Sequence, residues 1–431
     1  MKVFFDTVGC RLNQAEIEEM AGKLRQAGHE IVGRCEEADT VVINSCTVTA
    51  AASSDSRQKV RQAYHQGVEN IILTGCWATL YPQQAAALEG VSSVVNNIDK
   101  MNIPAQLLNI DDYMMELEPI SRKPLPGVHH RTRAFIKVQD GCDNFCTYCV
   151  TRLARGNAYS IPKEEIKLHI DEAVTGGTKE IVLTGVNLGS WGKDFDDDER
   201  LSNLLLYILE VTKIERIRLS SLEPWDIDPA FFDLWQNPRL CPHLHLPLQS
   251  GSRYVLQRMA RKTTPEEFRC LLDAARDRIP NLAVTTDVIV GFPGETESEF
   301  EESIQTIKGM NFNGGHVFKY SKRDGTAAAQ YPSQVSGKIA RERAHRIRSL
   351  FDEQEQKFQE FQVGLTQKVL WEACREIKTG LWTLEGYSEN YFRVQVSASE
   401  NRWNKIDPVT IEGIKDKILL GKINIFGSKV N

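Results

Sequence analysis

The sequence predicts an α/β protein with more than one domain. Short apolar runs of the buried-strand type alternate with segments of helical periodicity over most of its 431 residues. From about residue 362 the pattern changes to short strands separated by glycine-containing turns. Because a chain of this length exceeds one ordinary core, we expect a parallel-sheet βαβ domain, a central (β/α) domain and a small C-terminal antiparallel β-barrel.

The first third of the chain is predicted to consist of βαβ units. Apolar runs at 3–5, 40–43 and 71–73 have the character of buried parallel strands. A helix is expected between the first two runs, with Asn13 as its N-cap and Gly28 at its end. Such units place functional loops at the carboxyl ends of their strands.

A cysteine follows each of these three strands. Cys10, Cys46 and Cys76 take equivalent topological positions, whereas Cys35 does not. Since the carboxyl ends of parallel strands meet at one edge, the three thiols are expected to converge there, where thiolates would suit an iron–sulfur cluster. The alternative is three small buried residues at strand ends, a common use of free cysteine.

A second set of cysteines lies in the loop from Asp140 to Cys149. Cys142, Cys146 and Cys149 are close enough in sequence to bind one soft metal centre, which favours iron–sulfur, zinc or Cu(I). Three ligands on a four-iron cluster would leave one iron open. A zinc site would need a fourth ligand, for instance His129 or His130.

The Cx3CxΦC spacing, with Tyr148 directly before the last cysteine and a strand-like run at 134–139 before the loop, resembles the cluster loop of radical S-adenosylmethionine (SAM) enzymes. The resemblance implies a [4Fe-4S] cluster whose open iron binds the amino and carboxylate groups of SAM. It also favours iron–sulfur over zinc.

The middle of the chain continues the strand–helix alternation. Six such units predict an open, partial (β/α)6 barrel with its chemistry at the carboxyl ends of the strands. The candidate strands are 134–138, 180–184, 217–220, 244–248, 284–290 and 317–320. The resemblance implies SAM contacts from loops at those ends, namely Tyr148, Gly185, Asn187, Glu223, Gln249, Ile289 and Gly291. The segment 184–187 lacks the Gly-Gly-Glu of many relatives, and Glu223 is equally well explained as a helix-start carboxylate.

The C-terminal segment predicts a small antiparallel barrel. Its candidate strands are 368–372, 382–385, 392–396 and 418–425. Four aromatic residues could stack on unpaired bases or fill the barrel core: Tyr387, Tyr391, Phe392 and Trp403.

Together these features resemble the methylthiotransferases over essentially the whole chain. The resemblance implies four segments: an N-terminal domain at 1–115 with an auxiliary cluster, a linker at 116–130, a radical-SAM core at 131–361 and a TRAM-like RNA-binding domain at 362–431. It implies two [4Fe-4S] clusters, one on Cys10, Cys46 and Cys76 and the other, which binds SAM, on Cys142, Cys146 and Cys149. No catalytic residue is expected beyond these ligands.

Three motifs, 9–14, 320–326 and 385–391, look most like the branch that modifies C2 of N6-threonylcarbamoyladenosine at tRNA position 37. Arg323 is the candidate partner of the threonyl carboxylate, because a guanidinium binds a carboxylate through two hydrogen bonds. The branches acting on N6-isopentenyladenosine or on a ribosomal-protein aspartate are alternatives. A different class, a non-catalytic RNA-binding metalloprotein, also stays open.

Composition limits the location and the partners. No apolar run approaches the length of a membrane span, and an acidic residue at position 6 interrupts any signal-peptide core. The ten cysteines are therefore expected to be metal ligands or buried thiols in the cytoplasm, without a membrane partner. The net charge of −6 argues only mildly against nucleic acid. The resemblance implies tRNA and an electron donor such as flavodoxin or ferredoxin as partners.

Overall fold

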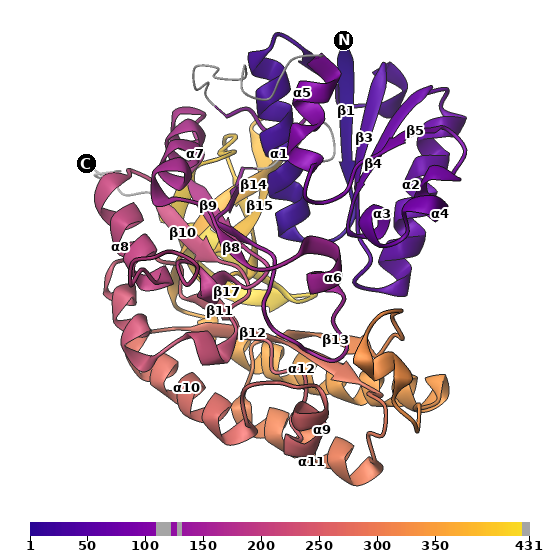
Figure 1. Ribbon diagram of the computed structural model, residues 1–431. Coiled ribbons are helices and arrows are strands. Elements are labelled where there is room, and N and C mark those ends of the chain that lie inside the picture. Colours follow the sequence, from indigo (N-terminus) through magenta and orange to yellow (C-terminus); the bar gives the residue numbers. More distant parts are fainter. Residues whose placement is uncertain (109–121, 127–131, 425–431) are drawn as a thin grey trace, which may run out of the picture. The chain divides into compact units, whose positions relative to one another are not determined.

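The computed structural model describes residues 1–108, 122–126 and 132–424. The chain divides into two compact units, residues 1–213 with 321–329 and residues 214–320 with 330–431. The predicted α/β class is confirmed: a parallel N-terminal sheet, central parallel strands and a C-terminal barrel are all present (Figure 1). Within the described ranges, none of the helices has the length and apolar character needed to cross a bilayer.

The N-terminal sheet has five parallel strands in the order β2-β1-β3-β4-β5. The strands are β1 (Lys2–Thr7), β2 (Glu30–Ile31), β3 (Thr40–Ser45), β4 (Asn70–Gly75) and β5 (Val91–Val94). The helices of this region are α1 (Arg11–Gln26), α2 (Ala50–His65), α3 (Cys76–Leu80), α4 (Pro82–Ala86) and α5 (Ile103–Leu108).

Side chains that point to the two opposite faces of this sheet form two separate apolar cores. On β1, Val3 and Phe5 belong to the core that also holds the apolar face of α1, including Leu24. On β3, Val41 and Ile43 belong to a second core with α2 and α3. Successive strand residues point to opposite faces, so a sheet covered on both faces needs continuous apolar runs.

The start of α1 differs from the prediction. Cys10, not Asn13, is the N-cap residue, and Asn13 lies within the first turn. The Asn13 side chain is buried and donates to the backbone oxygens of Val8 and Ser45 at 2.9 and 3.3 Å. Its amide therefore holds the strand-end loops together instead of capping the helix.

The rest of the first unit carries the second cysteine loop. Strands β6 (Ala134–Lys137) and β9 (Glu180–Thr184) pair in parallel, and β7 (Gln139–Asp140) pairs antiparallel with β8 (Tyr159–Ser160). The helices are α6 (Thr151–Arg155), α7 (Lys163–Thr175) and α8 (Leu201–Val211). The predicted linker at 116–130 lies mostly outside the described residues.

The second unit begins with the remaining central strands. These are β10 (Arg216–Leu219), β11 (His243–His245), β12 (Ala283–Val290) and β13 (Gly315–Lys319), of which the last three form a parallel sheet. The helices are α9 (Arg253–Arg258), α10 (Pro265–Arg278), α11 (Glu297–Met310) and α12 (Gly337–Gln362). The capping boxes at Thr264 and Thr296 begin α10 and α11.

The second unit ends in a closed barrel with the strand order β14-β15-β16-β18-β17. The strands are β14 (Thr366–Lys378), β15 (Leu381–Ser388), β16 (Arg393–Ala398), β17 (Ile406–Lys415) and β18 (Ile418–Ile423). The barrel is antiparallel except that β16 pairs in parallel with β18. Strand β17 was not predicted from the sequence. Phe392 is a core residue, whereas Trp403 is exposed and Tyr387 stacks on Tyr391.

Candidate active site

The three strand-end cysteines lie at one edge of the N-terminal sheet. Strands β1, β3 and β4 are direct neighbours, so Cys10, Cys46 and Cys76 follow adjacent carboxyl ends. A Cβ placed on Gly9 would lie 2.5 Å from Cys46 Sγ, and Gly9 has φ +103°. Only glycine allows the first strand-end loop to approach the second thiol this closely. The three cysteines thus lie at one edge of the sheet, as their positions after the strands predict.

The thiols of this triad influence one another. Burial raises the pKa of Cys46 to about 12, and the nearby thiols of Cys10 and Cys76 raise it further as they ionise. Desolvation by the surrounding protein also raises the pKa of Cys10, although that side chain keeps an accessible surface. Three thiolates here are unfavourable by themselves and suit a cationic metal core, whose binding displaces their protons.

Two asparagines contact this triad. The thiol of Cys10 donates to Asn13 Oδ1 at 3.5 Å, and Asn97 Nδ2 donates to Cys76 Sγ at 3.6 Å. The same Asn97 nitrogen donates to the backbone oxygen of Ala154 at 2.7 Å. Hydrogen bonds to ligand sulfurs are one means by which a protein tunes an iron–sulfur cluster.

The second triad lies in a loop that glycine allows to close. Gly141 has φ +67°, and a Cβ there would lie 1.8 Å from the backbone oxygen of Asn157. The Cys142 amide donates to the Gly156 oxygen at 3.2 Å, which closes the loop at its base. The amides of Asn144 and Thr151 approach the sulfurs of Cys142 and Cys149, each at 3.4 Å. These amides are placed to stabilise thiolates.

Neither triad has the geometry of a site for a single ion. Over the described ranges, no three Cys, His, Asp or Glu side chains converge on a point where one metal ion could sit. A four-iron cluster does not require such convergence, because each thiolate binds a different corner iron. His129 and His130, the candidate fourth zinc ligands, lie outside the described residues.

A buried ionic network lies beside both triads. Glu16 is fully buried and pairs with Lys100 at 2.5 Å and with Arg155 at 2.9 Å. Arg155 also pairs with Asp140 at 2.9 Å, and Lys137 lies 3.9 Å from Asp140. Burial alone would raise the pKa of Glu16, but Arg155 and Lys100 hold it below its usual value. The sequence gives no sign of this network, because Glu16 and Arg155 are 139 residues apart.

The predicted SAM loop in the first unit is organised by Gln139. Its Oε1 accepts from the amide of Asn187 at 2.8 Å, and a Cβ on Gly185 would lie 2.9 Å from that oxygen. Thr184 Oγ1 is buried and has no hydrogen-bond partner in the part of the chain that the structure describes. Tyr148 is half-buried in the cysteine loop. The loop thus offers an unsatisfied hydroxyl to a polar ligand.

The other predicted SAM residues belong to the second unit. Glu223 forms a two-point ion pair with Arg261, at 3.0 and 2.6 Å, and the Arg261 guanidinium lies 4.3 Å from the centroid of the Trp225 ring. Gln249 has φ +68°, and its backbone bonds to β12 through Asp287 and Ile289, each at 2.8 Å.

Gly291, at the end of β12, has φ +72°, and a Cβ there would lie 2.9 Å from Ala340 Cβ. Its amide donates to Glu295 Oε2 at 2.7 Å. This hydrogen bond fixes the turn at the end of the strand. A residue larger than glycine is excluded at position 291, because its Cβ would lie too close to Ala340.

Arg323 belongs to the segment 321–329, which packs on the cysteine loop within the first unit. The Ala328 amide donates to the Thr147 oxygen at 2.8 Å, and a Cβ on Gly325 would lie 3.0 Å from Leu153. Nε and Nη2 of Arg323 are buried, and neither has a hydrogen-bond partner among the residues described. Buried guanidinium nitrogens are costly when unpaired, so this side chain is suited to an anionic ligand.

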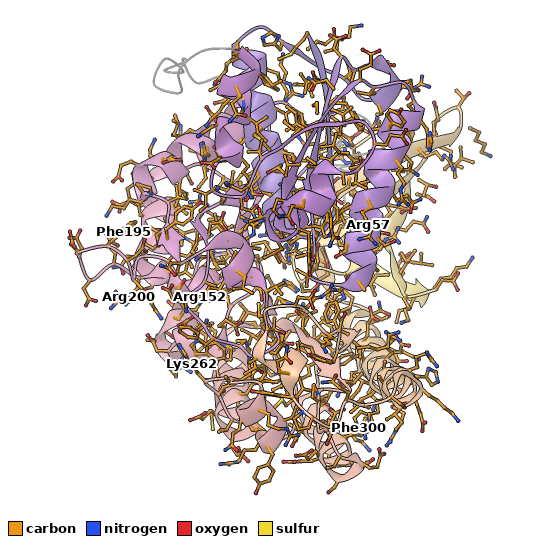
Figure 2. All side chains as sticks on the ribbon, turned by 45° about the vertical axis from the view of Figure 1, so that its right-hand side comes forward. Arg57, Arg152, Phe195, Arg200, Lys262 and Phe300 are labelled. Carbon is orange, nitrogen blue, oxygen red and sulfur yellow. The ribbon has the colours of Figure 1, made fainter. Side chains whose placement is uncertain are left out.

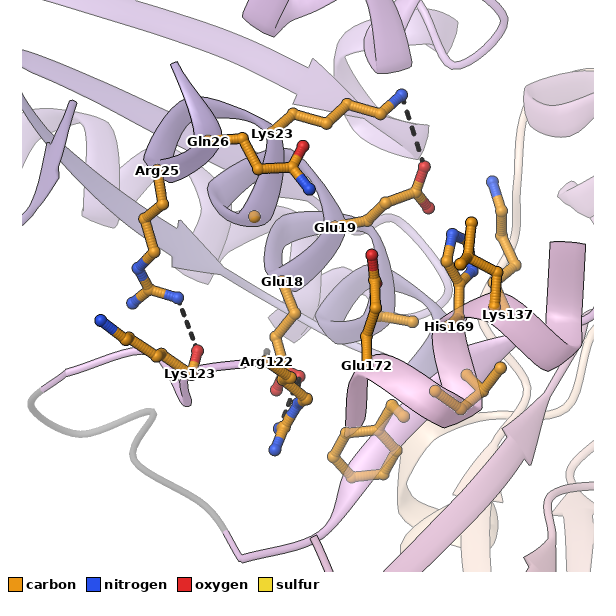
Figure 3. A pocket seen from close by; sticks show the side chains of 15 residues that line it. Glu18, Glu19, Lys23, Arg25, Gln26, Arg122, Lys123, Lys137, His169 and Glu172 are labelled. Carbon is orange, nitrogen blue, oxygen red and sulfur yellow. Dashed lines mark hydrogen bonds and ion pairs between the residues drawn. The ribbon is translucent and has the colours of Figure 1, made fainter. Parts of the chain in front are cut away.

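The first unit has two further features, a cation–ring contact in the cysteine loop and a cavity elsewhere. Arg152, labelled in Figure 2, lies 4.0 Å from the ring centroid of Phe145, which is 73% exposed. A cavity of about 220 Å³ is bordered by α1, α7 and residues 122–123. Figure 3 shows that several charged groups on its wall are paired, for example Lys23 with Glu19 and Arg25 with the backbone oxygen of Lys123. No cysteine is among its described lining residues.

Comparisons with known proteins agree with this arrangement. Residues 136–307 match the family model of the radical SAM superfamily, and residues 2–96 match a model described as uncharacterized protein family UPF0004. The threonylcarbamoyladenosine tRNA methylthiotransferase MtaB of Bacillus subtilis (strain 168) is 38% identical over 95% of this chain and 93% of its own length. The protein of the same name from Thermotoga maritima is 34% identical, with coverage of 96% and 95%.

A tRNA-2-methylthio-N(6)-dimethylallyladenosine synthase from Thermoanaerobacter sp. (strain X514) is 33% identical over 97% of this chain and 88% of its own length. Among solved structures, the radical SAM methyltransferase TsrM from Kitasatospora setae, with cobalamin and a [4Fe-4S] cluster bound, matches with a TM-score of 0.57. It is 12% identical and the match covers 76% of this chain and 77% of that one, so it supports the fold alone.

Proposed function

The chain belongs to the radical SAM methylthiotransferase family, and we propose that it adds a methylthio group to C2 of N6-threonylcarbamoyladenosine at position 37 of tRNA. The observation that carries this proposal is that two separate cysteine triads lie in one compact unit. One triad would be enough to cleave SAM. Insertion of sulfur needs a second metal centre beside the first.

The cofactors follow from the family and from the donor sets. As a radical SAM enzyme the protein uses SAM and a [4Fe-4S] cluster, which we assign to Cys142, Cys146 and Cys149. We assign a second [4Fe-4S] cluster to Cys10, Cys46 and Cys76. When bound, these groups supply radical removal of the C2 hydrogen and the sulfur donor. The chain's own residues bind and orient the reactants and exclude water.

The proposed functions are distributed over four segments of the chain. We propose an auxiliary-cluster domain at 1–115, a linker at 116–130, a radical-SAM core at 131–361 and an RNA-binding TRAM-like domain at 362–431. The two matched family models, at 2–96 and 136–307, support the first and third assignments. The closed barrel formed by β14–β18 supports the last.

SAM is proposed to contact two sets of residues. In the first unit the proposed contacts are Gly185, Asn187, Tyr148 and the Thr184 hydroxyl, which has no hydrogen-bond partner among the described residues; Gln139 holds the backbone amide of Asn187 in place. Glycine at 185 allows Gln139 to pack closely against this loop, because a Cβ there would lie 2.9 Å from Gln139 Oε1.

In the second unit, Glu223 is proposed to accept hydrogen bonds from ribose hydroxyls. Its ion pair with Arg261 fixes the carboxylate and leaves acceptor capacity free. Gln249, Ile289 and Gly291 are proposed to contact the adenine side. The left-handed backbone at Gln249 supports a functional role, because strain of this kind collects at ligand sites.

Arg323 is proposed to bind the threonyl carboxylate of the substrate. Its buried Nε and Nη2 are the two adjacent donors that a carboxylate accepts from. An isopentenyl group carries no charge and would leave these donors unpaired. Arg323 thus favours the threonylcarbamoyl substrate.

The proposed partners are tRNA and a reducing electron donor such as flavodoxin or ferredoxin, in the cytoplasm. The exposed Cys149 supports access of a donor to the SAM-binding cluster. Tyr387, Tyr391 and the exposed Trp403 are candidates for base contacts by the barrel.

The test uses protein reconstituted with iron and sulfide without oxygen, together with SAM and a reductant. Transfer RNA carrying N6-threonylcarbamoyladenosine is expected to yield its 2-methylthio derivative by nucleoside mass spectrometry. Transfer RNA carrying N6-isopentenyladenosine should stay unchanged. SAM cleavage without a methylthio product on either tRNA would contradict the proposal.

The isopentenyladenosine branch is the second candidate, because a synthase of the dimethylallyladenosine type is similar over 97% of the chain. Modification of that tRNA in the same assay would establish it. A ribosomal-protein aspartate is a third candidate, and a colourless, zinc-containing protein that binds tRNA would indicate a non-catalytic role. Nucleoside analysis of tRNA from a strain lacking the gene identifies the lost nucleoside directly.

A further inference from the structure

Arg155 contacts residues beside both cysteine triads. It is buried, and its Nη2 donates to Asn13 Oδ1 at 2.7 Å, three residues after Cys10. Its Nη1 donates to both carboxylate oxygens of Asp140, at 2.9 and 3.0 Å, two residues before Cys142. One guanidinium therefore joins the first turn of α1 to the start of the other cysteine loop.

The charges around Arg155 do not cancel. Three buried cations, Lys100, Lys137 and Arg155, face two buried carboxylates, Glu16 and Asp140. Glu19 also faces Lys137, but it is partly exposed and is paired with Lys23 at 3.6 Å. The buried group therefore keeps one positive charge in excess.

An uncompensated buried charge is costly unless an opposite charge lies nearby. Besides the two carboxylates, the described groups whose negative forms interact with Arg155 are the thiols of Cys76 and Cys10. Three thiolates outweigh the positive charge of a four-iron core, and reduction makes the site more anionic still. The excess charge thus matches a cluster on this triad.

We propose that Arg155 is a positioning residue that holds Asn13 beside Cys10 and raises the reduction potential of an iron–sulfur cluster on Cys10, Cys46 and Cys76. The inference rests on the proposed second cluster. A fixed positive charge stabilises the reduced, more anionic state more than the oxidised state, and the low dielectric of the buried network strengthens the effect.

Arginine is suited to this position in a way that lysine is not. The planar guanidinium donates hydrogen bonds to Glu16, Asp140 and Asn13 at the same time. Its charge also interacts with the thiols of Cys76 and Cys10. Lys100 is shielded from Cys76 by Asn97, which bonds to both of them. Of the three buried cations, Arg155 is therefore the one whose charge acts most directly on the thiols.

The experiment measures the midpoint potential of the auxiliary cluster alone. Cys142, Cys146 and Cys149 are replaced by alanine in the full chain, and the remaining cluster is titrated by electron paramagnetic resonance. Arg155→Gln removes the excess cation and is expected to lower the potential. Glu16→Gln removes an opposing carboxylate and is expected to raise it. Arg155→Lys retains the charge and should stay near the parent value.

The opposite signs separate a charge effect from structural damage. Arg155→Gln and Glu16→Gln break the same ion pair, so simple loosening would move both potentials in the same direction. Shifts of equal sign, or no shift, would overturn the inference. If either buried substitution prevents loading, Lys137→Gln and Asp140→Asn form a second pair with the same expected signs, lower and higher. A parent protein with no cluster would instead overturn the second cluster and this inference with it.

Discussion

Asn97 directs its side-chain amide at the thiol of Cys76, 3.6 Å away. The same nitrogen donates to Ala154, and the Asn97 oxygen accepts from buried Lys100 at 2.9 Å. One amide therefore links a strand-end cysteine to α6, which follows the other cysteine loop directly. The two triads share a hydrogen-bonded support instead of standing on independent loops.

Cys46→Ala is expected to remove one cluster and leave the other. Wild-type protein should bind about eight irons and the variant about four, because two thiolates rarely retain a four-iron cluster. Iron analysis with visible absorption measures the loss. Cys35→Ala is the control, since Cys35 packs against an apolar core, and it should keep all the iron. Equal iron in both variants would refute the assignment of Cys46.

Gly141→Ala is expected to abolish the SAM-binding cluster. The new Cβ would overlap the Asn157 oxygen at a positive φ, which we expect to cost at least about 3 kcal/mol. Gly156→Ala, at φ +78° and ψ −160° with no atom within 4 Å of the new Cβ, should cost only the backbone strain, about 1–3 kcal/mol. Thermal unfolding and iron content compare the two. Similar losses in both would show that backbone conformation, and not the overlap, determines the effect.

Arg323→Gln is expected to lower kcat/KM for tRNA carrying N6-threonylcarbamoyladenosine by about 10- to 100-fold. This range corresponds to the loss of hydrogen bonds to a charged group, about 1.5–3 kcal/mol. SAM cleavage in the absence of tRNA should be unchanged. Lys322→Gln, at the exposed neighbouring position, is the control. An unchanged kcat/KM in Arg323→Gln would exclude Arg323 as the carboxylate partner.

Asp407→Asn is expected to destabilise the barrel in a pH-dependent manner. Asp407 accepts from Trp371 Nε1 at 2.7 Å and pairs with Arg402 at 2.5 and 2.6 Å. Burial opposes ionisation, but Arg402 and Trp371 bring the pKa of Asp407 below its ordinary value. The ionised form therefore contributes stability above the unfolded pKa near 4, and this contribution is lost as the pH falls through the folded value.

The loss in Asp407→Asn should be about 1–3 kcal/mol at pH 7 and should shrink below pH 4. Denaturant unfolding monitored by tryptophan fluorescence, with wild type measured at the same pH values, tests this. A difference that stays constant down to pH 3 would show that the carboxylate charge is not involved.

The sequence was sufficient for the fold class and for the placement of three cysteines after neighbouring strands, because both depend on local patterns. Short apolar runs that alternate with helical segments predicted the strands. The parallel order of these strands then brought Cys10, Cys46 and Cys76 to one edge. Strand β17 was missed since Pro408 interrupts its pattern. Proline has no amide to donate, yet here it pairs with Lys368 and accepts from the Asn424 amide at 2.8 Å.

The supporting residues could not be predicted for a different reason. Gln139, Asn97 and Arg155 act through contacts between segments far apart in the chain, and none has a local signature. Asn13 did have a local signature, that of a helix cap. This signature was misleading, because the Asn13 side-chain amide donates to the backbone oxygens of Val8 and Ser45 instead. The candidate metal ligands are thus more visible in a sequence than the residues that hold them in place.

The presence of two clusters can be tested by anomalous diffraction at the iron edge from crystals of the reconstituted full chain. We predict two separate four-iron clusters, one on Cys10, Cys46 and Cys76 and the other on Cys142, Cys146 and Cys149, each with one iron that no protein side chain binds. A single cluster, a zinc ion at either triad, or a fourth protein ligand on either cluster would contradict it.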